Sequence, residues 1–205
     1  MNYTQLASQE SIEKTIAALK EHNFNALVVA TKADALAKIH ELIPAGASLM
    51  KGSSETLREI GFVDLLKSKD HPWNNLHDDV LAETDPEKQA KLRRESVLSD
   101  FYLGSAHAVT ETGELMVASN TGSQLPHLVF TSKYIILVVG AQKIVPSMQT
   151  GFARIDEHVL LLEDERMKGV YGFGTFHAKT LILHKENPAM GRSIHVILVN
   201  EVLGF

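Results

Sequence analysis

The sequence predicts an α/β protein with a three-layer α/β/α arrangement around a mostly parallel, locally mixed sheet. Short, almost wholly apolar segments of strand length recur along the chain, and segments with helical periodicity separate many of them. Buried strands that alternate with helices are typical of a sheet covered on both faces. The chain has 205 residues, enough to bury one core without a disulfide or a metal, so a single domain over residues 1–205 is expected.

The first half of the chain reads as two helix–strand pairs. Apolar side chains recur on one face of each predicted helix, and each predicted strand is apolar and bounded by polar or turn residues. The helices are expected at residues 9–22 and about 33–43, and the strands at 26–30 and 47–51. This repeated order favours crossover connections between parallel strands.

A charged helix is predicted over about residues 86–98. Asp85 followed by Pro86 is the pattern of an N-cap and a first-turn proline. The segment before it, HPWNNLHDD (71–79), has no clear period and is predicted to be a lid or a surface loop.

The second half of the chain is richer in strands, some of which can pair antiparallel. A long amphipathic helix is expected among them at about 147–163. The strands are predicted at 100–103, 107–110, 114–118, 134–139, 180–184 and 193–200.

Composition excludes several classes of function. The chain has no cysteine, so it cannot supply a thiolate nucleophile or hold an iron–sulfur cluster with cysteine ligands. Its formal net charge of −5 has the wrong sign for binding nucleic acid. No apolar run reaches the ~20 residues that cross a bilayer, and no leader-like segment begins the chain, so a cytoplasmic protein without a membrane partner is expected.

The segment KGSSETLREIG (51–61) is a candidate anion-binding loop. Gly52, Ser53, Ser54 and Thr56 lie where a predicted strand passes into a short helix, and free amides and hydroxyls there could contact a phosphate or a carboxylate. The alternative is an ordinary N-cap at Ser53 or Ser54, with Gly61 ending the helix.

The segment HAVTETGEL (107–115) is a second candidate site. Glu111 lies in a predicted tight turn at a strand end, where a carboxylate could act as a general base or nucleophile. The alternative is a hairpin turn with a solvated glutamate. The other candidate ligand-binding residues near this strand pair are Thr110, Thr112, Gly113, Asn120 and Gly122.

The histidines do not predict a metal site. The chain has ten, but none stands at a recognised ligand spacing, and a histidine beside an apolar strand usually makes local hydrogen bonds. The histidines considered are His77, His107, His127, His177 and His195. Lys143 is different, because it follows the most apolar strand and could face an anionic ligand.

Three segments resemble the LUD family, the lactate-utilisation family formerly called a domain of unknown function. Residues 99–145, with the turn TETG and the ending KIV, are similar to the central block of that family. Residues 51–61 resemble its glycine–serine–threonine segment, and RSIHVILVNEVLGF (192–205) resembles its closing strand.

The resemblance implies a fold related to ribose-5-phosphate isomerases, glucosamine-phosphate deaminases and CoA transferases. In CoA transferases of this architecture a glutamate on a glycine-bearing turn forms the acyl intermediate, and Glu111 is the comparable position. Many relatives have Gly-Asn-Arg where this chain has Gly122, Ser123 and Gln124. An arginine that could hold an anionic group is therefore replaced.

Two functional hypotheses follow from the resemblance. In the first, the chain is a cluster-free accessory subunit of a lactate-utilisation system that oxidises lactate to pyruvate. It would bind a small anion, carry no cofactor of its own, and depend on iron–sulfur partner proteins for any Fe–S cluster. In the second, it is a stand-alone enzyme that acts on an acyl-CoA or a phosphorylated small molecule, with Glu111 as base or nucleophile. A homo-oligomer is compatible with both.

Overall fold

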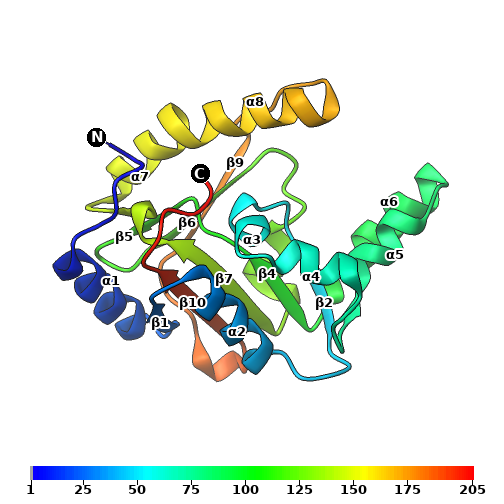
Figure 1. Ribbon diagram of the computed structural model, residues 1–205, viewed down its shortest axis with the longest axis horizontal. Coiled ribbons are helices and arrows are strands. Elements are labelled where there is room, and N and C mark those ends of the chain that lie inside the picture. Colours follow the sequence, from blue (N-terminus) through cyan, green and yellow to red (C-terminus); the bar gives the residue numbers. More distant parts are fainter. Residues whose placement is uncertain (1) are drawn as a thin grey trace.

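A computed structural model describes residues 2–205, and these form two separate β-sheets (Figure 1). The larger sheet has six strands, all parallel, in the order β1-β10-β7-β4-β2-β3. Its strands are β1 (Asn25–Val29), β2 (Ser48–Lys51), β3 (Asn74–Asn75), β4 (Phe101–Gly104), β7 (Tyr134–Gly140) and β10 (Ser193–Val199). The predicted parallel sheet is therefore present.

The smaller sheet corrects the prediction of one locally mixed sheet. Its order is β8-β5-β6-β9, and the antiparallel pairs of the chain lie here. The strands are β5 (Ala108–Thr110), β6 (Leu115–Ser119), β8 (Ile144–Val145) and β9 (Lys179–Leu183). Local periodicity identifies a strand but carries no information about which sheet it joins, so sequence patterns could not separate the two.

The helices agree with the predicted ones at most positions. They are α1 (Gln9–Glu21), α2 (Lys32–Leu42), α3 (Glu55–Glu59), α4 (Phe62–Ser68), α5 (Leu76–Ala82), α6 (Pro86–Glu95), α7 (Met148–Arg154) and α8 (Leu160–Tyr171). A π-helical turn, Ile155–Val159, joins α7 to α8, so the helix predicted to end near 163 continues to 171.

Residues 71–79 are more ordered than predicted. They contain the short edge strand β3 and the first turn of α5, which Asn75 caps by accepting a hydrogen bond from the His77 amide at 3.3 Å. The prediction of an irregular loop was wrong because β3 consists of two polar asparagines, which give no strand signal.

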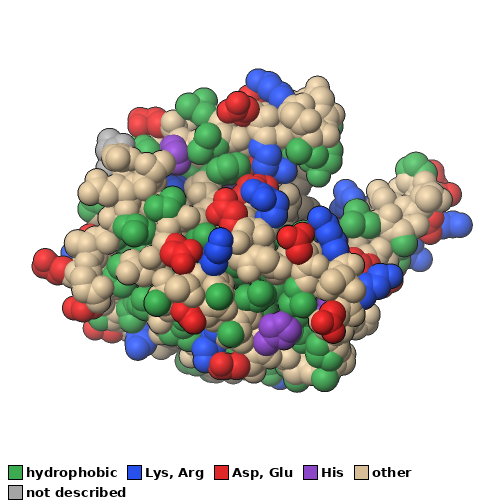
Figure 2. Space-filling view, viewed as in Figure 1, with side chains coloured by type: hydrophobic (Ala, Val, Ile, Leu, Met, Phe, Trp, Pro, Cys, Tyr) green, Lys and Arg blue, Asp and Glu red, His purple; other side chains and the backbone are tan. Residues whose placement is uncertain are grey.

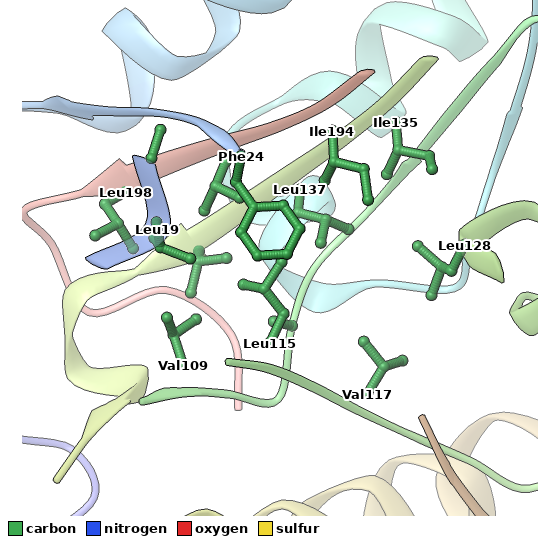
Figure 3. Close-up of a cluster of buried hydrophobic side chains, with 14 of the residues drawn as sticks. Leu19, Phe24, Val109, Leu115, Val117, Leu128, Ile135, Leu137, Ile194 and Leu198 are labelled. Atoms are coloured by element: carbon green, nitrogen blue, oxygen red, sulfur yellow. The ribbon is translucent and has the colours of Figure 1, made fainter. Parts of the chain in front are cut away.

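The two faces of the larger sheet pack against different partners. Alternate residues of β7 point to opposite sides, as the period of two requires. Ile136 and Val138 pack with α2, α3 and α4. Leu137 and Val139 pack with α1 and the smaller sheet, and Figure 3 shows this second cluster with Leu19, Leu115 and Val117 around it. The outer face of the smaller sheet packs on α7 and the π-helical turn.

Helices α5, α6 and α8 lie at the periphery of the molecule (Figure 1). In Figure 1, α8 runs along the top of the view over the smaller sheet, and α5 and α6 project to the right. The ends of β2, β4 and β6 lie between them. Among residues 2–205 no helix is both long enough and apolar enough to cross a bilayer.

Candidate functional site

A cavity of about 500 Å³ lies beyond the ends of β2 and β4 and beneath α8. The loops after β2, β4 and β6 supply its walls, together with α5, α8 and the segment after α8. Figure 2 shows the surface hollowed between α8 and the α5–α6 projection. The ends of parallel strands are the usual location of ligand sites in open α/β sheets.

Lys143 is a buried cation on the cavity wall. It ends a 3₁₀ turn directly after β7, and its Nζ donates hydrogen bonds to Thr56 Oγ1 at 2.9 Å and Ser105 Oγ at 3.3 Å. No carboxylate among residues 2–205 forms an ion pair with it. Burial, and secondarily the positive charge of Arg154, lowers the pKa of Lys143 to about 7.

The C-terminal segment of the chain packs close to Lys143. Gly204 has φ of +58° and lies against Thr56 Oγ1, where a Cβ atom would clash with that oxygen. The Thr56 hydroxyl also donates to the Leu203 carbonyl at 3.3 Å. The Lys143–Thr56 pair is therefore enclosed on this side by backbone that only glycine accommodates.

An aromatic pair forms another part of the wall. The Tyr102 ring stacks on the His127 ring with centroids 4.5 Å apart. Burial raises the pKa of Tyr102 and lowers that of His127 to about 4, so both are neutral near pH 7. Tyr102 is only 3% exposed. Its hydroxyl forms no hydrogen bond within the described part of the chain. This hydroxyl is available to a ligand.

His107 lies in the cavity wall, and Arg154 lies behind it. Burial, followed by the charge of Lys143, lowers the pKa of His107 to about 3. His107 Nδ1 accepts from the Ala118 amide at 3.1 Å, so the neutral ring carries its proton on Nε2. Arg154 is fully buried and donates from Nη1 to the His107 carbonyl at 2.6 Å, while its Nε and Nη2 have no partner in residues 2–205. Burial lowers the pKa of Arg154 to about 10, which leaves it charged at neutral pH.

Arg166 links α8 to the loop after β2. Its guanidinium donates to both oxygens of Glu163 at 2.6–2.7 Å and to Ser53 Oγ at 3.5 Å, and it lies 3.9 Å from Glu55. The cavity lining contains four basic residues, and Glu55 and Glu163 are its acidic ones. The basic residues are Lys51, Arg93, Lys143 and Arg166. The lining thus has an excess of positive charge that favours an anionic ligand.

Of the predicted ligand-binding residues, five line this cavity. They are Gly52, Ser53, Ser54, Thr56 and Asn120. Ser54 is also the N-cap of α3, since its hydroxyl accepts from the Leu57 amide at 3.2 Å, so the capping interpretation is correct for this residue. Gly122 lies between two lining residues, Thr121 and Ser123, but is not itself in the wall.

The turn around Glu111 lies at the opposite end of the β5–β6 hairpin. Glu111 accepts a hydrogen bond from Ser11 Oγ at 2.7 Å and forms a 2.8 Å ion pair with Lys14, both on α1. The hydrogen bonds from Lys14 and Ser11 lower the pKa of Glu111. Gly113, with φ of +93°, packs against the backbone of Ala18.

The two predicted loops are therefore not brought together. His107 at the start of β5 and Ser119 at the end of β6 reach the cavity, whereas the turn that contains Thr110, Glu111, Thr112 and Gly113 does not line it. An antiparallel hairpin separates its turn from its open end, and the sequence gives no indication of which end faces a cavity.

Sequence reasoning missed Tyr102, Ser105 and Arg166. Tyr102 lies in an apolar strand, where the sequence indicates a core residue, and no local pattern around Ser105 indicates a ligand site. Arg166 lies in α8, three residues beyond the end of the amphipathic helix predicted at about 147–163, and nothing local connects it with Ser53. Across residues 2–205, no three His, Cys, Asp or Glu side chains gather into a group that could hold a metal ion.

Comparison with known proteins identifies the family. No curated protein matches the sequence. A crystal structure of a DUF162 family protein from Deinococcus radiodurans is similar in fold, with a TM-score of 0.55, 14% sequence identity, and coverage of 96% of this chain and 100% of that one. Residues 12–199 match the sequence profile of the LUD domain. Because that match covers most of the chain, this protein belongs to the LUD domain family.

Proposed function

We propose that this LUD domain protein is the cluster-free accessory subunit of a lactate-utilisation system and binds a small anion in the cavity beside Lys143. The family assignment implies a role in lactate utilisation. The observation that supports the anion site most directly is Lys143, a buried cation on the cavity wall without a carboxylate partner among residues 2–205.

The burial of a charged group costs free energy unless an opposite charge lies beside it. A buried ammonium group is normally paired, because desolvation costs several kcal/mol per ion. Here two hydroxyls accept hydrogen bonds from the Lys143 ammonium group, and no carboxylate of residues 2–205 forms an ion pair with it, although the charge of Glu59 partly offsets that of Arg154. With a pKa of about 7, Lys143 is only partly protonated near neutral pH, and a carboxylate or phosphate that enters the cavity supplies a negative charge that favours its protonated form.

The accessory role is supported by the absence of cysteine from the sequence. Oxidation of lactate to pyruvate releases two electrons, and the chain has no thiolate ligands for an iron–sulfur cluster that could accept them. We expect the purified chain to oxidise no lactate, and activity to appear when iron–sulfur partner proteins are added. Lactate turnover by the isolated chain would contradict the accessory role.

Anion binding is tested by thermal unfolding with lactate, pyruvate and inorganic phosphate. A ligand that binds the folded state raises the melting temperature by mass action. We expect stabilisation of the parent protein by at least one of these anions and its loss in Lys143→Met, which keeps the length and apolar stem of the side chain. Lys20→Met, a change of an exposed lysine on α1, is the matched control and should leave the stabilisation intact. Equal stabilisation of all three proteins would contradict the site.

The second candidate is a stand-alone enzyme for an acyl-CoA or a phosphorylated small molecule, on a fold related to isomerases and CoA transferases. The size of the cavity favours it, because about 500 Å³ lies in the range of sites for drug-sized ligands. In the form with Glu111 as base or nucleophile, this candidate requires a second site at the turn 110–113, because Glu111 does not line this cavity. Glu111→Gln should then abolish turnover without unfolding the protein, and a CoA thioester should leave a hydroxylamine-sensitive adduct on Glu111. Unchanged turnover in Glu111→Gln would remove Glu111 from the mechanism.

A further inference from the structure

We propose that the cavity binds a ligand in which a phosphate group is joined to a heteroaromatic ring, as in a nucleotide or a coenzyme built on one. The proposal rests on the anion site beside Lys143 and adds a second, aromatic part to it. Two features of the cavity lead to this class of ligand: its polar interior and the aromatic side chains at its opening.

The aromatic side chains lie at the end of α8 and in the segment that follows it. Tyr171, Phe173 and Phe176 all line the cavity, yet they are 56%, 61% and 65% exposed. A side chain that both lines a cavity and is more than half exposed lies at the cavity opening. The rings of Tyr171 and Phe173 are 5.9 Å apart. Three exposed aromatic residues within six positions leave ring faces in water that a planar ligand could cover.

Hydrogen bonds hold the aromatic segment in place. The Thr175 amide donates to Asp164 Oδ1 on α8 at 2.7 Å, and Asn120 Nδ2 donates to Thr175 Oγ1 at 3.1 Å. His177 contacts Asp156 Oδ1 at 2.7 Å and Thr180 Oγ1 at 2.6 Å. The segment is thus fixed to α8, to the loop after β6 and to β9, which gives the aromatic side chains a defined position.

The interior offers partners for phosphate oxygens. Lys143 provides a positively charged donor, and the Tyr102 hydroxyl, which has no hydrogen-bond partner in the described chain, provides a second donor. The Thr56 and Ser105 hydroxyls hold Lys143 in place and already donate to the Leu203 and Ala106 carbonyls. Hydroxyl and ammonium donors of this kind are typical partners of phosphate. A three-carbon acid could neutralise Lys143, but it would fill only a small part of a cavity of about 500 Å³.

The test compares a nucleotide with its two parts by isothermal titration calorimetry. The probes are ADP, inorganic pyrophosphate and adenosine, with coenzyme A as a larger nucleotide-based probe. We expect ADP or coenzyme A to bind roughly tenfold or more tightly than pyrophosphate, because stacking of one base on an aromatic side chain contributes an affinity gain of this order. Whichever of these two probes binds more tightly shows whether the natural ligand is a free nucleotide or a coenzyme.

Variants separate the two parts of the site. The double variant Phe173→Ala/Phe176→Ala should lose roughly tenfold or more in affinity for the nucleotide and keep its affinity for pyrophosphate. Lys143→Met should weaken both. Phe130→Ala is the matched control, because Phe130 is 68% exposed and lies outside the cavity lining. The substituted aromatic residues are exposed, so circular dichroism and melting temperature should match those of the parent.

The outcomes distinguish this inference from the anion site on which it rests. If pyrophosphate binds as tightly as ADP and coenzyme A, or if the double variant binds the nucleotide like the parent, the aromatic part is refuted while Lys143-dependent pyrophosphate binding keeps the anion site. If none of the four probes binds, the nucleotide inference is overturned, and the anion site then stands or fails on the melting experiments with lactate, pyruvate and phosphate.

Discussion

At the scale of single residues, Lys143 is the side chain that brings buried positive charge to the cavity wall. A lysine is rarely buried without a carboxylate partner, because the protein must then desolvate its charge or suppress its protonation. Here the larger of the two charge effects on Lys143 also comes from a cation, because Arg154 is fully buried behind the same wall, and the carboxylate of Glu59 opposes it only in part. The two positive charges act on a partly enclosed space from which bulk water is largely excluded, so one anion gains more interaction energy there than it would in water.

This environment predicts an unusual dependence of stability on pH. The pKa of Lys143 is about 7 in the folded protein against an ordinary 10.5, so between these values the unfolded chain binds more protons than the folded one. Stability from this residue therefore rises with pH across the window from about 7 to 10.5, by roughly 1 kcal/mol per pH unit, and is constant below and above it. Urea unfolding of the parent and Lys143→Met between pH 7 and 10 measures the difference between the two proteins. A difference that does not change with pH over this window would mean that Lys143 has an ordinary pKa.

The residues that line the cavity could be predicted from the sequence only in part. The position of Lys143 directly after the most apolar strand suggested that it could face an anion, and the structure places it in the cavity wall. Tyr102 could not be identified in this way. Its hydroxyl points into the cavity because β4 ends beside Gly52, a contact between residues 50 positions apart that no local pattern contains.

At the scale of elements, the loop between β2 and α3 combines two roles in adjacent serines. Ser54 caps α3, and its hydroxyl accepts the Leu57 amide. The Ser53 hydroxyl instead accepts a hydrogen bond from Arg166 on α8 at 3.5 Å and lines the cavity. The sequence could predict a cap at one of the two serines, but the contact with α8 required the fold.

The two serines should therefore respond differently to substitution. Ser54→Ala removes the cap and should lower the free energy of unfolding by about 1 kcal/mol. Ser53→Ala removes one contact between the loop and α8 and should change the free energy of unfolding by less. Chemical denaturation of both variants provides the measurement, with the parent as reference. A larger loss of stability in Ser53→Ala than in Ser54→Ala would contradict these roles.

The π-helical turn between α7 and α8 could not be predicted from the sequence, although the helix that contains it could. The helix predicted over 147–163 is present, but its apolar periodicity does not reveal that one turn is widened at Ile155–Val159. Ile155 and Val159 both line the cavity, and Arg154 directly precedes them. π-Helical turns occur frequently at functional sites, which agrees with this position.

At the scale of the whole molecule, the chain forms a site by bringing one end of each sheet together. The strand ends of the parallel sheet supply Gly52 and Ser105, and the open end of the β5–β6 hairpin supplies His107 and Ser119. The α/β class and most element positions follow from local periodicity. The separation into two sheets does not, because it depends on contacts between segments far apart in the chain, such as β6 with β9.

The overall arrangement places the two loops that the sequence singled out at opposite ends of the β5–β6 hairpin. The loop after β2 lies in the cavity wall, and the turn at Glu111 lies on α1 at the far end of the hairpin. A ligand held by Lys143 would contact the first and leave the second in its ion pair with Lys14. The position of a bound anion is therefore the most informative property to measure.

The most direct measurement is a titration of ¹⁵N-labelled protein with lactate, pyruvate and phosphate, followed by amide chemical shifts across the chain. Binding beside Lys143 predicts the largest shifts at Thr56, Ser105 and Lys143, little change in the turn 110–113, and loss of the response in Lys143→Met. Shifts centred on 110–113, or no response to any of these anions, would contradict the anion site that we propose.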